Sequence, residues 1–187
     1  MNVTEAIYAR RATRAYQERK VEDDEIRSLL RAAVQAPSAM NAQSWAFAIV
    51  QSPSTLKRWS DGAKAMLLET VAHEPKVKHH LTHLNDPSFN IFYDASTLVV
   101  IGSHARSTYV DGDCWLAAEN LMLAATDAGL ATCPIGLALP LLNTRDVKEE
   151  LRFASEGVAV AAIVLGFPRG DVAAVARKEP EVSAWIR

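Results

Sequence analysis

Cysteine and net charge are both scarce in this chain of 187 residues. The two cysteines, Cys114 and Cys133, are far apart in apolar surroundings, which favours buried thiols in a reducing compartment over a disulfide framework. The 20 basic and 22 acidic residues give a formal net charge of -2, so the molecule lacks the positive field of a general nucleic-acid binder. We therefore expect no nucleic-acid partner.

Long hydrophobic runs, internal repeats and low-complexity linkers are also missing. No apolar run approaches the roughly 20 residues that a membrane span needs, and the first residues do not resemble a signal peptide. Hydrophobic residues make up 49% of the chain, enough for one domain with a substantial core. We expect a single domain over residues 1–187, cytoplasmic and without a membrane partner.

Capping signals and periodicity predict two helices near the start. Asn2, with Glu5 three positions later, can cap a first helix that runs into the arginines after it. Apolar residues recur at intervals of three and four over 21–36, and Pro37 ends that second helix.

Later segments predict a sheet covered by helices. Short apolar runs predict strands at 45–50, 97–103, 130–136 and 158–166, and helices are expected at about 53–71, 115–128 and 145–152. The most apolar helix can be capped by Asp111 or Asp113 and ended by Gly129. Because helices exceed strands and the strands are apolar on both faces, we predict an α+β fold; the long apolar helices also favour a homodimer.

The segment RRATRAY, residues 10–16, carries three arginines and no acidic residue. On a helix, Arg10 and Arg14 would lie one turn apart, so that two guanidinium groups could converge on one anion such as a phosphate monoester. An isolated basic cluster is more often a solvated face. The segment alone leaves both interpretations open.

The uncharged stretch APSAMNAQSW, residues 36–45, lies between a helix and a strand. Its carboxamides, Asn41 and Gln43, can each donate and accept hydrogen bonds, and its small side chains allow the backbone to come close to a ligand. Such a loop suits a flat heterocycle such as the pyrimidine edge of a flavin. Taken alone, it is also ordinary turn chemistry.

Two further features lie late in the chain. In CPIG, residues 133–136, a strand gives way to a loop whose backbone N–H could donate to a ring nitrogen. The tail carries Arg169, Arg177 and Lys178 before Trp185. Each feature alone is typical of an ordinary turn or a solvated tail.

Taken in order, RRATRAY, APSAMNAQSWAF, the central apolar helix, GLATCPIG, AIVLGFPRG and RKEPEVSAW resemble the nitroreductase family of FMN-dependent NAD(P)H oxidoreductases across almost the whole chain. The resemblance implies a three-layer α/β/α fold with a central mixed sheet, and a homodimer with FMN at the subunit interface. It also implies ping-pong transfer of hydride from NADH or NADPH through FMN to an electron-poor acceptor such as a nitroaromatic or a quinone. Because the cofactor performs this chemistry, no catalytic side chain is expected.

The resemblance assigns two tasks to the opening arginines. Arg10 falls on the position that contacts the FMN phosphate, with Arg11 as a helper, and Arg14 on the position beside N1 and O2 of the ring. Ala12 departs from the serine that is usual in the family, which removes a hydroxyl donor and leaves its backbone N–H.

Three other segments complete the implied cofactor site. They are the loop expected to reach the flavin of the partner subunit (Pro37, Ser38, Ala39, Asn41 and Gln43), the strand end whose backbone amide would face N5 (Pro134, Ile135 and Gly136), and the tail cations at the phosphate (Arg177 or Lys178).

Residues 73–93 match nothing in the family closely. Phe89, Phe92 and Tyr93 can stack over the ring there and are the predicted substrate pocket. His79 and His83 lie at a spacing that can ligate zinc, but no third ligand is near in sequence. A solvated helix or a pocket wall is therefore favoured, and no metal is predicted.

Two other functions stay open. One is a flavin-dependent enzyme of the same fold that oxidises or dismantles its ligand without a nicotinamide. The other is a non-catalytic FMN-binding protein or small-molecule carrier. The sequence distinguishes neither the physiological acceptor nor NADH from NADPH.

Overall fold

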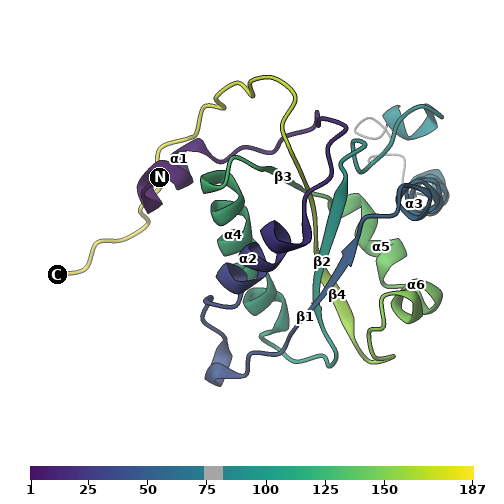
Figure 1. The fold of residues 1–187 in the computed structure, drawn as a ribbon. Helices are drawn as coiled ribbons and strands as arrows, with labels where there is room; N and C mark the ends of the chain where they lie inside the picture. The colour runs from purple at the N-terminus through teal and green to yellow at the C-terminus, as the bar shows by residue number, and fades with distance from the viewer. Residues whose placement is uncertain (74–81) are drawn as a thin grey trace.

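One antiparallel sheet organises the molecule, seen in a computed structural model that describes residues 1–73 and 82–187 (Figure 1). Its strands, in the spatial order β1-β2-β4-β3, are β1 (Trp45–Val50), β2 (Thr97–Ser103), β3 (Ala131–Pro134) and β4 (Val158–Gly166). Every pairing between these strands is antiparallel. A mixed sheet was expected. Among the described residues, the only parallel pairing is an isolated bridge between Ala12 and Thr132.

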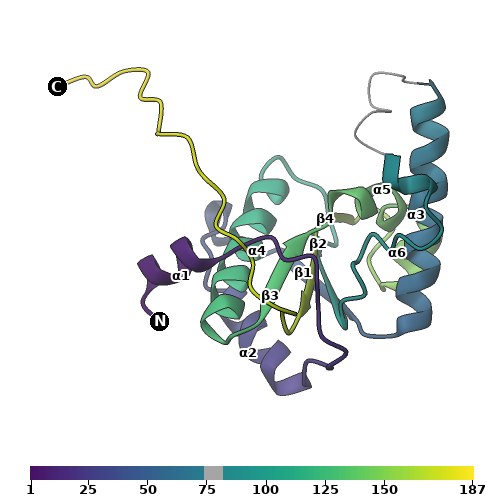
Figure 2. The same cartoon turned by 90° about the horizontal axis from the view of Figure 1, so that it is seen from above.

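Helices cover both faces of the sheet (Figures 1 and 2). One layer holds α1 (Val3–Ala9), α2 (Asp23–Ala33) and α4 (Val110–Asp127), and the other holds α3 (Pro53–His73), α5 (Leu139–Leu142) and α6 (Arg145–Glu150). Short 3-10 turns follow α2, α3 and β3: η1 (Ala39–Asn41), η3 (Thr82–Asn85) and η4 (Gly136–Ala138). The predicted α+β fold with three layers is confirmed.

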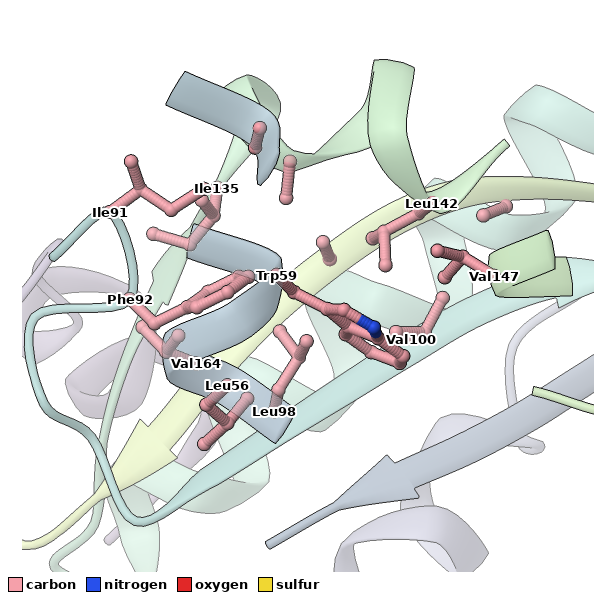
Figure 3. Packing of buried hydrophobic residues seen from close by; sticks show 14 of the residues in the cluster. Leu56, Trp59, Ile91, Phe92, Leu98, Val100, Ile135, Leu142, Val147 and Val164 are labelled. Atoms are coloured by element: carbon pink, nitrogen blue, oxygen red, sulfur yellow. The ribbon is translucent and has the colours of Figure 1, made fainter. Parts of the chain in front are cut away.

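Alternating residues of the central strands point to opposite faces of the sheet and belong to two hydrophobic cores. Val99 of β2 and Ile163 of β4 pack with α2 and α4, whereas Val100 and Val164 pack with α3, α5 and α6. Figure 3 shows the second core, with Trp59 of α3 lying over β2. The central strands are buried throughout because helices cover both of their faces.

The central helix α4 begins earlier than its apolar pattern suggested. Tyr109 occupies the N-cap without a side-chain bond, so the prediction that Asp111 or Asp113 caps the helix is wrong. Asp113 is instead a buried residue inside the helix. The predicted end is confirmed, with Gly129 in the left-handed region at φ 74°. Among the described residues, no helix combines the length and apolarity needed to cross a bilayer.

The first helix ends before the arginines, contrary to prediction. The Asn2–Glu5 capping box forms, but α1 stops at Ala9 and Arg10 is extended, at φ -55° and ψ 133°. Beyond it the chain runs beside β3, where the N–H of Thr13 donates to the carbonyl of Thr132 at 3.0 Å. The open edge of β3 supplies backbone partners that a longer, exposed helix would not have offered.

This extended path changes the spacing of the arginines. At about 3.3 Å per residue, Arg10 and Arg14 lie up to about 13 Å apart along the chain, not one helical turn. The two side chains therefore cannot be assumed to share one anion.

Candidate functional site

Residues 10–16 are anchored between β3 and the chain that follows β4. Tyr16, only 2% exposed, bridges to Pro168, and its hydroxyl donates to the carbonyl of Thr13 at 2.8 Å. Its ring lies against Gly166, where an added Cβ would approach a ring carbon to 2.9 Å. Glycine is therefore required at the end of β4 for this segment to pack on the sheet.

Arg169 also holds this segment in place, a role that nothing in the sequence indicated. Its backbone N–H donates to the carbonyl of Ala15, and its Nε donates to the carbonyl of Tyr16, both at 2.9 Å. A basic residue after a final strand gives no sequence signal for this role, because its partners are backbone carbonyls more than 150 positions away.

The first two arginines differ in what they contact. Arg10 is half-buried, and its Nε lies 3.6 Å from a carboxylate oxygen of Glu119 on α4. Arg11 donates through Nη1 to the carbonyls of Tyr8 and Arg10, at 2.5 and 2.8 Å. Arg11 thus closes the C-terminal end of α1, and Arg10 is the better placed of the two to bind an anion.

A hollow of about 210 Å³ lies beside Arg10 and Arg11. Thr13, Pro168 and Gly170 contribute to its lining, so it lies where the anchored segment meets the start of the C-terminal tail. Arg10 and Arg11 line this hollow together with the acidic residue Asp171, and its volume is large enough for a small anion such as a phosphate group.

Arg14 lies beside the loop that precedes β2. Its guanidinium carbon is 5.9 Å from the centroid of the Tyr93 ring, and its contact with Tyr93 is the main cause that raises the pKa of Arg14. Tyr93 and Asp94 both adopt the left-handed region, at φ 55° and 54°. Asn90 holds this turn, since its Nδ2 donates to Asp94 Oδ1 at 2.7 Å.

Only two of the three predicted pocket aromatics are accessible. Phe89 and Tyr93 are half-buried and meet edge to face, with ring centroids 6.0 Å apart. Phe92 has no exposed surface and packs in the core beside Ile91, so its placement in a substrate pocket is wrong (Figure 3). Adjacent aromatic residues in a turn look alike in sequence, and only packing separates them.

Two buried polar side chains of α3 hold this aromatic loop. The ammonium of Lys64 donates to the carbonyl of Phe89 at 2.8 Å, and the hydroxyl of Ser60 accepts from the N–H of Ile91 at 3.1 Å. Lys64 is 7% exposed and Ser60 is fully buried. Their position on the buried face of a helix was the available sequence signal.

The end of β3 presents an open backbone position. The N–H of Ile135 donates to the carbonyl of Ala162 at 2.7 Å, and Ile135 is buried. Gly136 is exposed, a Cβ there would meet nothing within 4 Å, and within the described chain its N–H donates no recorded hydrogen bond. Earlier in strand β3, burial raises the pKa of the Cys133 thiol, which keeps that thiol neutral.

The loop of residues 36–44 holds an unusual backbone shape. Met40, Asn41 and Gln43 all adopt the left-handed region, at φ 53°, 55° and 48°. For residues other than glycine, this conformation costs roughly 1–2 kcal/mol each, somewhat less for asparagine. The strain must be offset by contacts that fix the loop.

Hydrogen bonds within the loop and one bond to α4 offset that strain. The N–H of Gln43 donates to Ser38 Oγ at 3.0 Å, and its side chain donates to Asn41 Oδ1 at 3.0 Å. The N–H of Ala39 donates to Asp113 Oδ1 of α4, also at 3.0 Å. Met40 stands out at the tip, 98% exposed.

Within one subunit, the sheet register puts this loop and the arginine segment at opposite ends of the sheet. Trp45, which follows the loop, is level with Ser103 and Val158, whereas Thr132, beside the arginines, is level with Leu165. Seven residues of β4 separate these levels, about 23 Å at 3.3 Å per residue. Figure 1 shows the same separation, with η1 at the lower left and residues 10–16 along the top.

Two other predicted groups are not brought to the arginines. Arg177 and Lys178 lie in the exposed tail that leaves the body of the molecule on the side of α1 (Figures 1 and 2). His79 falls outside the described residues; His83 is exposed and lies 6.0 Å from the Phe89 ring, centroid to centroid. In the part of the chain that is described, no three His, Cys, Asp or Glu side chains gather as a metal site.

The fold and site together define a class. This is a three-layer α+β protein whose sheet edge carries a half-buried arginine, a second arginine beside an aromatic loop, and an open backbone amide. Such an arrangement suits an elongated anionic ligand with a flat ring.

The chain belongs to the nitroreductase family. The sequence model of that family matches residues 7–167. An Archaeoglobus fulgidus protein provisionally named NADH dehydrogenase/NAD(P)H nitroreductase is 28% identical over 166 residues, covering 88% of this chain and 84% of its own length.

Solved structures share the whole fold. A nitroreductase from Bacteroides fragilis with bound FMN superposes with a TM-score of 0.82 at 24% identity, over 100% of this chain and 98% of that one. An iodotyrosine deiodinase bound to FMN and 3-iodo-L-tyrosine gives a TM-score of 0.75 at 25% identity, over 97% of both chains.

Proposed function

We propose that this protein is an FMN-dependent oxidoreductase that takes hydride from NADH or NADPH and passes it to an electron-poor acceptor such as a nitroaromatic or a quinone. The observation that carries the proposal is the pair of motifs at opposite ends of the sheet, each anchored by its own contacts. The family membership and the FMN named for the Bacteroides fragilis neighbour support it.

The exposed polar groups around β3 fit FMN. Arg10 would hold the phosphate together with the backbone N–H of Ala12, and the hollow beside Arg10 is large enough to admit that group. Arg14 would face the N1 and O2 edge of the ring, and the open N–H of Gly136 would face N5. When bound, the flavin supplies the hydride chemistry, while the protein supplies position and charge.

The same geometry favours a homodimer with FMN between the subunits. Loop 36–44 lies about 23 Å along β4 from the arginine segment of its own chain, so a single chain cannot readily bring both to one small ligand. A two-fold dimer can place the loop of one chain beside the arginines of the other. Exposed apolar side chains on α1 and α4, among them Tyr8, Trp115 and Leu116, suit such an interface.

The acceptor would bind against Phe89 and Tyr93. Both rings are partly exposed, and the loop that carries them is fixed from below by Lys64. The tail cations Arg177 and Lys178 would join the phosphate only if the exposed tail folds back in the dimer. We further propose one domain over residues 1–187 and a reducing, cytoplasmic setting, which the two free buried cysteines fit.

The colour of the protein tests the proposal directly. Purified protein, or protein reconstituted with FMN, should show the absorbance of a bound flavin, and anaerobic NADH or NADPH should bleach it. Addition of a quinone or a nitroaromatic should restore the colour. Failure to bind FMN would exclude this function, and FMN binding without turnover of any acceptor would indicate a carrier.

A flavin enzyme that does not use nicotinamide is the second candidate. The likeness to an iodotyrosine deiodinase, at 25% identity over 97% of the chain, is the observation that favours it. In that case dithionite should reduce the bound flavin quickly, whereas NADH and NADPH should not. Rapid bleaching by either nicotinamide would exclude this candidate.

A further inference from the structure

Asp113 is a carboxylate buried in the layer of α4. It lies in the first turns of the helix and is only 6% exposed. Burying an ionised carboxylate is costly unless hydrogen bonds and favourable dipoles compensate. The N-terminal end of α4 supplies such a dipole, but the side chain accepts its hydrogen bond from loop 36–44 and not from the backbone of α4.

The contacts of Asp113 bracket loop 36–44 on both sides. Its Oδ1 accepts from the N–H of Ala39 at 3.0 Å, near the start of the loop. Its backbone carbonyl accepts from Nε1 of Trp45, also at 3.0 Å, directly after the loop. The bonds of Ser38, Asn41 and Gln43 are internal to the loop, so Asp113 fastens it to the body of the molecule.

We propose that Asp113 is a positioning residue that holds loop 36–44 in the shape needed to complete the FMN site of the partner subunit. Asp113 then acts on a flavin that it does not touch and that is anchored by the arginines of the other chain. The inference rests on the proposed homodimer with FMN between its subunits.

The strained backbone of the loop makes this role sensitive. Three residues in the left-handed region leave the native shape little favoured over its alternatives, so the loss of one outside bond shifts the population toward them. The apparent dissociation constant rises in proportion as the binding-competent fraction falls. Loss of a hydrogen bond to a charged group should lower that fraction by about tenfold to hundredfold.

Three variants test the side-chain bond. Asp113→Ala should raise the FMN dissociation constant, measured by quenching of flavin fluorescence, by about tenfold to hundredfold. Asp113→Asn keeps an acceptor oxygen and should recover most of the affinity. Asp111→Ala removes an exposed carboxylate from the same end of α4 and should change nothing. Wild-type affinity in Asp113→Ala would overturn the inference.

A second variant removes the same bond from the loop. Ala39→Pro deletes the N–H that Asp113 accepts, at the first position of η1, where proline is tolerated. Ser38 before it is already extended, at φ -137° and ψ 150°, as a residue preceding proline should be. This variant should lose at least as much affinity as Asp113→Ala, because Ala39 is itself a loop residue expected at the flavin, and it serves if Asp113→Ala does not fold.

Hybrid dimers separate the cross-subunit role from a general loss of structure. Chains carrying Arg10→Ala and chains carrying Asp113→Ala are given different tags, co-expressed and purified as hybrids. One site of each hybrid then combines an intact Arg10 with an intact loop, and the other site has both defects. At an FMN concentration that leaves both parents empty, the hybrid should bind about half of the wild-type amount.

The outcomes separate the two proposals. An empty hybrid would show that Arg10 and the loop of the same chain serve one site, and it would overturn the cross-subunit role of Asp113. If the wild-type protein itself binds no FMN, the proposed function fails first. If Arg10→Ala weakens FMN binding while Asp113→Ala does not, the function stands and the inference falls.

Discussion

Residues 10–16 and loop 36–44 are both assigned to one ligand, yet they are built in opposite ways. The first segment is bonded to the sheet on two sides and buries Tyr16 almost completely. The second is mostly exposed and keeps a strained shape through bonds within itself and one to Asp113. The first should therefore open only with the whole fold, and the second should open locally.

Removing the anchor of the first segment should have the largest effect. Tyr16→Ala deletes a fully packed aromatic ring and should lower the free energy of unfolding by about 3–5 kcal/mol. Urea denaturation measures this. Tyr109→Ala removes a tyrosine that is 60% exposed and should stay within about 0.5 kcal/mol of the wild type. Equal effects at the two positions would mean that the first segment is not part of the cooperative fold.

Removing a ligand contact from the same segment should change binding but leave the fold intact. Arg10→Ala should weaken FMN binding by about 1.5–3 kcal/mol, because a hydrogen bond to a charged phosphate is lost. Titration of the apoprotein with FMN measures it, with circular dichroism as the check on folding. Arg11→Ala, whose guanidinium already bonds the carbonyls of Tyr8 and Arg10, should lose less. Unchanged affinity in Arg10→Ala would place that arginine outside the site.

A change inside the loop should be felt only locally. Ser38→Ala removes the oxygen that accepts from the N–H of Gln43 and should destabilise the loop by about 0.5–1.5 kcal/mol. Hydrogen exchange at the Gln43 amide should accelerate, while the urea midpoint should hardly move. A shift of the midpoint as large as the local effect would contradict the local opening of this loop.

Replacing a buried cysteine should have the smallest effect on stability at neutral pH. Cys114 follows Asp113, which holds the loop, and Cys133 follows Thr132, which pairs with the arginine segment. Burial is the main cause that raises the pKa of Cys114 to about 12, from an ordinary value of 9.0. The native thiol stays neutral while the unfolded one ionises, so stability is fully present below about pH 9 and declines from there toward pH 12. Urea unfolding at pH 7 and pH 10.5 should show a smaller alkaline loss in Cys114→Ala than in the wild type. Equal losses would argue against a buried, neutral thiol.

Much of the framework could be predicted from residues alone. The apolar runs at 45–50, 97–103 and 158–166 became β1, β2 and β4, and the helix expected from Pro53 became α3. These predictions succeeded because short apolar runs rich in β-branched residues favour buried strands, whereas a longer run favours a helix. The motifs around Arg10 and Asn41 likewise indicated the family that the comparisons confirm.

The failures lie where a neighbour distant in sequence overrides a local preference. The first helix stops at Ala9 because β3 offers its edge, which no local pattern reveals. Arg11 binds carbonyls of α1, Phe92 enters the core, and Asp113 turns to the loop before β1 instead of capping α4. Each outcome depends on which surfaces the folded layers bring together.

Composition, periodicity and motif order were enough to establish the α+β layers and the family of this chain, because they reflect burial and backbone preferences that act over a few residues. The spacing of Arg10 from Arg14, the separation of the two motifs and the tether from Asp113 depended on folding in three dimensions. They arise from backbone and side-chain bonds between segments as much as 154 positions apart, and such partners become neighbours only when the sheet and its helices pack.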